Sequence, residues 1–99
     1  MGSKARIEIQ NGGFQGMEFE LSAAETLIGR NPTTDVTLLD EGISREHAVI
    51  LLDEESGIYT VEDLQSTNGT KVNGKRVRSA ALSSGDVIEL GRTRFQFFC

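Results

Sequence analysis

The chain has 99 residues, of which 37% are hydrophobic and 25% charged, and its formal net charge is −5. These values favour one globular domain, and no apolar run approaches the about 20 residues that a membrane-spanning helix needs. The negative charge disfavours loose nucleic-acid binding, which draws on a spread basic surface. One cysteine and one histidine exclude an internal disulfide and the usual zinc sites, so we expect no metal and no cofactor.

The chain begins with Met-Gly-Ser, which is typical of a cloning remnant and lacks the apolar segment of a signal peptide. We therefore expect residues 1–5 to be such a remnant or a disordered start, and residues 6–99 to form the domain. The single cysteine, Cys99, suits a reducing compartment, so we expect a cytoplasmic location without membrane insertion.

Alternating apolar and polar residues, the pattern of half-buried β-strands, recur along most of the chain. Residues 17–21 alternate in this way and place Met17, Phe19 and Leu21 on one face. Residues 47–53 are apolar at successive positions, which predicts a strand deep in the structure. Further strands are predicted at 26–28, 58–64, 87–90 and 94–98.

Turn signals separate these strands at short intervals. The Asn-Gly pairs at 11–12, 68–69 and 73–74 tolerate the positive φ that tight hairpin turns require. About ten short strands are expected and no helix, because the helix-leaning segments 22–26 and 78–85 are too short to be stable. This pattern predicts an all-β sandwich or barrel.

Three polar loops, residues 29–35, 40–46 and 64–70, interrupt the strands, and loops on a rigid scaffold are where binding residues concentrate. Ser44 and His47 could be taken for a nucleophile and its base. A working triad also needs an orienting carboxylate and oxyanion donors, and no nucleophile-elbow, metalloprotease or phosphate-loop motif occurs. We therefore predict that the protein is not an enzyme.

Arg30, Ser44 and Arg45 bring two guanidinium groups and one hydroxyl from two of these loops. A phosphate monoester carries about −1.5 to −2 charges and three acceptor oxygens, which suit arginine's planar fork and a hydroxyl donor. Thr67 and Asn68 add further polar groups, and an asparagine amide can pair with an extended peptide backbone. The set indicates a phosphorylated side chain held beside a peptide. Singly, each residue also fits a purely structural role.

The order of these motifs resembles a forkhead-associated (FHA) domain. Gly-Arg at 29–30 is followed by Ser-Arg-Glu-His at 44–47, Ser-Thr-Asn-Gly-Thr at 66–70 and Val-Asn-Gly at 72–74. The linking segment 31–50 and the closing segment 82–97 are similar to the family too, so the resemblance runs from about Arg6 to Phe98. It implies a sandwich of two antiparallel sheets, FHA/SMAD-like, with binding loops at one end.

The resemblance also implies roles for individual residues. Arg30 and Ser44 match the family's phosphate-binding pair, and Arg45 occupies the next position, where a further phosphate contact is often found. Asn68 matches the residue that hydrogen-bonds the peptide main chain, and Thr67 the neighbour that lines the threonine methyl pocket. The matching scaffold positions, expected to support the site, are Gly29, His47, Gly69 and Asn73.

The expected function is therefore phosphothreonine-dependent binding of a peptide or protein, which recruits a phosphorylated partner in Ser/Thr kinase signalling. The isolated domain is expected to be monomeric. Asp40 and Glu41 would offer a carboxylate pair to the peptide side chain three places after the phosphothreonine, favouring a basic or small residue there. The alternative left open is a phosphate-independent structural or oligomerising module within a larger assembly.

Overall fold

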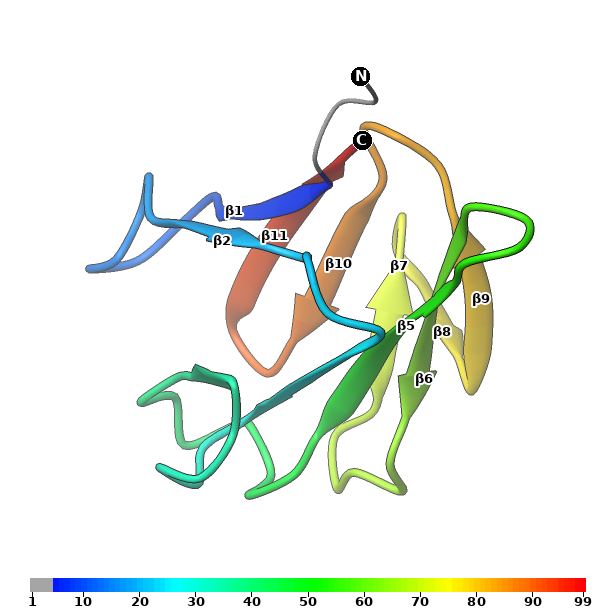
Figure 1. Ribbon diagram of the computed structural model, residues 1–99. Helices are drawn as coiled ribbons and strands as arrows, with labels where there is room; N and C mark the ends of the chain where they lie inside the picture. Colours follow the sequence, from blue (N-terminus) through cyan, green and yellow to red (C-terminus); the bar gives the residue numbers. More distant parts are fainter. Residues whose placement is uncertain (1–4) are drawn as a thin grey trace.

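The computed structural model describes residues 5–99, and in this range the chain forms eleven strands and no helix. Figure 1 shows the strands gathered in two layers. One sheet has six strands in the order β2-β1-β11-β10-β7-β8, and the other has five in the order β4-β3-β5-β6-β9. The strands are β1 Arg6–Ile9, β2 Glu18–Glu20, β3 Glu25–Gly29, β4 Val36–Thr37, β5 Ala48–Asp53, β6 Ile58–Asp63, β7 Thr70–Val72, β8 Lys75–Val77, β9 Ser79–Leu82, β10 Val87–Leu90 and β11 Thr93–Phe98.

The predicted all-β sandwich is confirmed. Every strand pair is antiparallel except β3 with β4, which run parallel, so the sheets are mostly rather than wholly antiparallel. Among residues 5–99 no helix is present that could cross a membrane.

The core lies between the two sheets and is built from alternate residues of the strands. In β11 Phe95 and Phe97 are fully buried, and Ile50 and Val61 face them from the five-stranded sheet's β5 and β6. The rings of Tyr59 and Phe97 lie 5.4 Å apart between centroids and join the two layers. Burying one large apolar side chain contributes about 1.5–3 kcal/mol, so this interdigitated core fixes the scaffold under the loops.

Two strand predictions need refinement. β5 does occupy the middle of its sheet, but Val49 on its outer face is only half-buried. Met17 is 46% exposed, because it lies in the loop before β2 rather than inside the strand.

The helix-leaning segment 78–85 contains strand β9, which pairs with β6 and buries Leu82. Tertiary pairing thus overrides a weak local preference.

The three Asn-Gly pairs do not make the same turn. Asn73 and Gly74, with φ of 53° and 85°, form the predicted two-residue hairpin turn between β7 and β8. Gly12 lies in a longer loop between β1 and β2, and Gly69 comes directly before β7, so neither forms a two-residue hairpin.

The chain's start departs from the expected boundary. Ala5 is buried at 3% exposure, and its carbonyl accepts a hydrogen bond from the Leu21 N–H at 2.9 Å. The other residues of the expected remnant, 1–4, lie outside the described residues.

Candidate functional site

The loops that follow β3, precede β5 and follow β6 lie together at the lower end of the molecule in Figure 1. Backbone hydrogen bonds hold two of them side by side: the Arg30 N–H donates to the Ser44 carbonyl at 3.0 Å, and the Asn31 N–H donates to the Arg45 carbonyl at 3.1 Å. The two arginines and the serine predicted from sequence are therefore brought together by the main chain.

Gly29 permits this close approach. A Cβ at this position would lie 2.0 Å from the Arg45 carbonyl oxygen, which is backbone and has little freedom to move. Any larger residue would push the two loops apart. The glycine before Arg30 is thus required by packing and not by a positive φ.

The Arg30 side chain is exposed but anchored. Its Nε donates to the Ile43 carbonyl at 3.0 Å, which fixes the plane of the guanidinium beside the loop that carries Ser44. Arg45 is also exposed. An anchored, exposed guanidinium suits an oxyanion, because less side-chain freedom is lost when the ligand binds.

Ser44 connects the second loop to the third. Its Oγ accepts a hydrogen bond from the Thr67 N–H at 3.1 Å. Because the oxygen serves as acceptor in this contact, the hydroxyl hydrogen can point elsewhere and donate to an anion. The half-buried Ser44 is therefore oriented by a neighbouring backbone amide.

The buried His47 ring supports both loops from beneath. Its Nδ1 accepts from the Ser44 N–H at 3.0 Å, so the ring proton is on Nε2, which donates to the Gly69 carbonyl at 2.8 Å. Its main-chain N–H and carbonyl pair with Ile28 and Leu64. One side chain thus links the serine loop to the Asn68–Gly69 turn.

Asp63 at the end of β6 organises that turn and was missed in the sequence. Its carboxylate accepts from the Ser66 N–H at 3.1 Å, from the Ser66 hydroxyl, and from the Thr70 hydroxyl at 2.8 Å. Burial raises the pKa of Asp63, but the hydrogen bonds from Ser66 and Thr70 outweigh it and lower the pKa below its ordinary value. The sequence feature that could have identified Asp63 is an acidic residue at the end of a predicted strand, shortly before the Ser-Thr-Asn-Gly run.

Asn68 projects from this turn toward the second loop. Its Nδ2 donates to the Gly42 carbonyl at 2.8 Å, and both Asn68 and Thr67 are exposed. The five predicted binding residues therefore lie on three loops that contact one another. Asn73 does not belong to this group: it joins the β7–β8 turn to Asp86 and Val87 near the start of β10.

The expected carboxylate pair at residues 40–41 is not available as a pair. Asp40 accepts from the Gly42 N–H and the Arg92 N–H at 2.8 Å each, and from the Thr93 hydroxyl at 2.9 Å. Burial raises the pKa of Asp40, yet these hydrogen bonds outweigh it and the pKa is lowered. Asp40 therefore ties the second loop to the β10–β11 hairpin, and only Glu41 remains as an exposed carboxylate.

Arg76 of β8 is a second residue that sequence reasoning missed. A Cβ built on Gly69 would lie 2.4 Å from its Nε, so the Arg76 side chain extends along the Asn68–Gly69 turn. It places an exposed cation beside the third loop. The signal was its place in the Val-Asn-Gly-Lys-Arg run at residues 72–76.

The family model for the FHA domain matches residues 26–91, which are two thirds of the chain and include the three loops of the candidate site. The chain belongs to the FHA domain family. FHA domains bind phosphothreonine peptides through loops at one end of a sandwich, which is the arrangement found here.

Similar proteins support the assignment. The glycogen accumulation regulator GarA of Mycolicibacterium smegmatis is 39% identical over 93 residues, which cover 94% of this chain and 58% of the relative. An FHA domain structure concerned with phosphothreonine-dependent interactions is 32% identical with a TM-score of 0.89, covering 98% of this chain and 97% of that one. Mycobacterium tuberculosis EmbR in complex with a low-affinity phosphopeptide is 34% identical with a TM-score of 0.86, over 97% of this chain and 24% of EmbR. The chain thus spans little more than half the length of GarA.

Proposed function

We propose that this FHA domain binds a protein phosphorylated on threonine and thereby recruits it in Ser/Thr kinase signalling. The observation that carries the proposal is the junction of Arg30 and Ser44. Their loops are paired through the main chain at 3.0 Å, and Thr67 orients the serine hydroxyl at 3.1 Å. Two arginines and an oriented hydroxyl on adjoining loops supply the positive charge and the donors that a phosphate monoester requires.

Each residue has a distinct role in this proposal. Arg30 and Ser44 hold the phosphate, and Arg45 adds a second cation. Asn68, already directed across to the second loop, pairs with the peptide backbone, and Thr67 contacts the threonine methyl group. Gly29, His47 and Gly69 keep the three loops in contact. Asn73 instead holds the β7–β8 turn against the start of β10.

The expected affinity is that of a reversible reader. A hydrogen bond to a charged group contributes about 1.5–3 kcal/mol, and ordering the peptide offsets part of the sum. The result is a dissociation constant on the order of micromolar. Preference for phosphothreonine over phosphoserine needs burial of one methyl group, worth about 1–3 kcal/mol.

The relatives support a regulatory role for the protein that contains the domain. GarA is named for glycogen accumulation, and a relative from Corynebacterium efficiens, 37% identical over 94% of this chain and 64% of its own length, is named an oxoglutarate dehydrogenase inhibitor. We extend the proposal to a non-enzymatic module that is monomeric in isolation and acts in the cytoplasm. These extensions rest on the family and on the names of the relatives.

Isothermal titration calorimetry tests the proposal directly. One peptide sequence is compared as phosphothreonine, phosphoserine and unphosphorylated forms, with the wild type, Arg30→Ala and the matched control Arg78→Ala. Arg78 is an exposed arginine that follows β8. Binding only to the phosphothreonine form, lost in Arg30→Ala and kept in Arg78→Ala, is expected. Equal binding of all three forms would favour the phosphate-independent structural module instead.

A further inference from the structure

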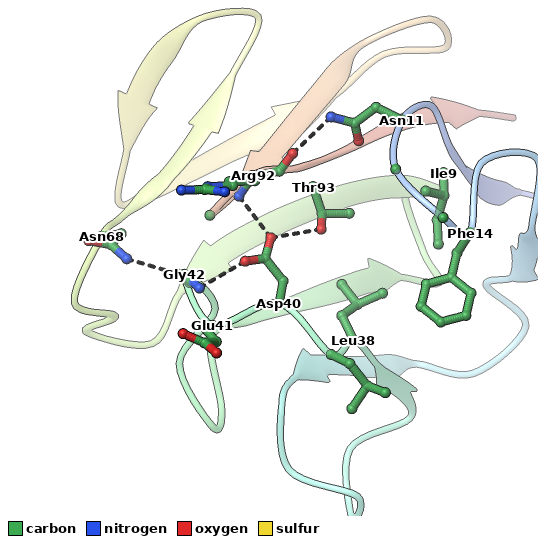
Figure 2. Close-up of a pocket in the computed structure, with 14 residues that line it drawn as sticks. Ile9, Asn11, Phe14, Leu38, Asp40, Glu41, Gly42, Asn68, Arg92 and Thr93 are labelled. Atoms are coloured by element: carbon green, nitrogen blue, oxygen red, sulfur yellow. Dashed lines mark hydrogen bonds between the residues drawn. The ribbon is translucent and has the colours of Figure 1, made fainter.

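A groove of about 850 Å³ opens next to the proposed phosphopeptide site. Figure 2 shows Asn68 at one end and Phe14 and Leu38 at the other, with Asp40 and Arg92 between them. The walls come from the β1–β2 loop, the loop between β4 and β5, and the β10–β11 hairpin. This volume lies within the 300–1,000 Å³ typical of ligand sites.

Hydrogen bonds connect the three walls of the groove. Asp40 accepts from the main chain of Gly42 and Arg92 and from the Thr93 hydroxyl, at 2.8–2.9 Å. Asn11 connects the β1–β2 loop to the β10–β11 hairpin. Its Nδ2 donates to the Arg92 carbonyl at 2.8 Å, and its Oδ1 accepts from the Arg94 N–H at 3.0 Å. The groove is therefore formed before any partner binds, which lowers the entropy lost on binding.

The end of the groove away from Asn68 exposes large apolar side chains. Phe14 is 51% exposed and Leu39 is 78% exposed, and both line the groove. Apolar residues scattered singly over a surface are ordinary, whereas apolar side chains gathered in a groove mark interaction sites. Phe14 belongs to the β1–β2 loop, which none of the five predicted binding residues occupies, so the apolar end lies apart from the proposed phosphate contacts.

Continuity with the phosphopeptide site identifies the occupant. Gly42 and Asn68 line the groove and also form the 2.8 Å contact at the proposed peptide-binding turn. A peptide held by Asn68 reaches the groove by simply continuing in an extended conformation, whose rise is about 3.3 Å per residue. A second copy of the chain is a poorer fit, because stable dimers bury about 800 Å² on each partner and this surface is one narrow opening.

Resting on the proposed function, we propose that the phosphorylated partner carries a second anchor: a large aliphatic or aromatic side chain that docks between Phe14 and Leu39. The third residue after the phosphothreonine would meet the Asp40–Gly42 segment. Phe14 lies at the opposite end of the groove from Asn68, so the second anchor lies further along the partner than that third residue. Specificity then has two parts, a phosphate clamp at Arg30 and Ser44 and an apolar contact at Phe14 and Leu39.

The test uses phosphothreonine peptides in which a single leucine is moved through an otherwise alanine- and serine-rich sequence on both sides of the phosphothreonine. Calorimetry with the wild type is expected to show affinity gains of about tenfold for leucine placed beyond the third following residue. The gain should disappear in Phe14→Ala/Leu39→Ala. The all-alanine phosphopeptide should bind that variant and the wild type equally, which also shows that the variant is folded.

Ile58→Ala is the matched control, because Ile58 is 50% exposed and does not line the groove. It should keep the full leucine gain. Three outcomes overturn the second anchor but leave the proposed function intact. Binding depends on phosphate but leucine adds no affinity, leucine adds affinity only within the first three residues, or the gain survives Phe14→Ala/Leu39→Ala. Self-association of the wild type that Phe14→Ala/Leu39→Ala abolishes, seen by sedimentation, would assign the groove to a second copy and overturn the proposal. Loss of phosphate dependence in the all-alanine peptide contradicts the proposed function itself.

Discussion

The main-chain N–H of Ser44 donates to Nδ1 of His47 at 3.0 Å, three residues along the chain. This contact places a fully buried imidazole against the main chain of the residue whose hydroxyl is proposed to hold phosphate. Since the opposite ring nitrogen donates to the Gly69 carbonyl, the geometry of two binding loops depends on one side chain. In the sequence pair that suggests a nucleophile and its base, His47 is thus a structural support for the loop of Ser44.

His47→Ala is therefore expected to act on stability first and on binding second. It removes two buried hydrogen bonds and leaves a cavity, so the free energy of unfolding should fall by about 3 kcal/mol. Urea denaturation measures that loss, and phosphopeptide titration at a temperature where the variant is folded measures the smaller effect on affinity. Lost binding at unchanged stability would instead place His47 in contact with the ligand.

Arg30→Ala should do the reverse. Its guanidinium is exposed and makes one anchoring bond to the Ile43 carbonyl, so the melting temperature should fall by no more than about 4 °C. Phosphopeptide affinity should fall roughly a hundredfold or more, because several charge-assisted bonds are lost. Arg30→Lys keeps the charge without the planar fork and should recover only part of the affinity. A large fall in melting temperature would recast Arg30 as a structural residue.

Gly29→Ala should destabilise the fold and weaken binding together. The added Cβ meets the Arg45 carbonyl oxygen at 2.0 Å, so the loops of Arg30 and Ser44 must separate. We expect a loss of about 2 kcal/mol or more in the free energy of unfolding, by the same denaturation assay. Gly13→Ala is the control, since a Cβ there meets nothing within 4 Å and its φ is not positive. Equal stability of the two variants would contradict the packing argument.

Acid should loosen the site through Asp40 and Asp63. Both have pKa values lowered in the folded protein, so their contribution to stability is present above the unfolded-state pKa, about 3.9, and is lost as the pH falls through the folded-state values. The free energy of unfolding should therefore decrease from roughly pH 5 downward.

Asp63→Asn isolates one of these carboxylates. At neutral pH it should cost about 1–3 kcal/mol, because Ser66 and Thr70 lose a charged acceptor, and its acid decline should be shallower than that of the wild type. Glu54→Gln, which removes a charge from an exposed turn, should follow the wild-type curve. Parallel declines for Asp63→Asn and the wild type would show that Asp63 does not contribute.

Local patterns in the sequence determined the all-β class, the alternation that buries Phe95 and Phe97, and the Asn73-Gly74 hairpin. The sequence also suggested the five residues of the proposed site. Strand periodicity and turn chemistry depend on neighbours in the chain, so they are legible without a fold. Strand β9 was hidden, because its pairing with β6 is a contact between segments distant in sequence.

Only the tertiary structure decided what the polar residues do. It assigned the Asp40 carboxylate to internal hydrogen bonds, gave Asp63 its place beneath the Ser66–Thr70 turn, and brought Phe14 beside a loop some 25 residues further along the chain. A carboxylate or a phenyl ring has the same chemistry wherever it stands in the sequence. Whether it is satisfied internally or presented to a partner depends on which distant backbone groups the fold places against it.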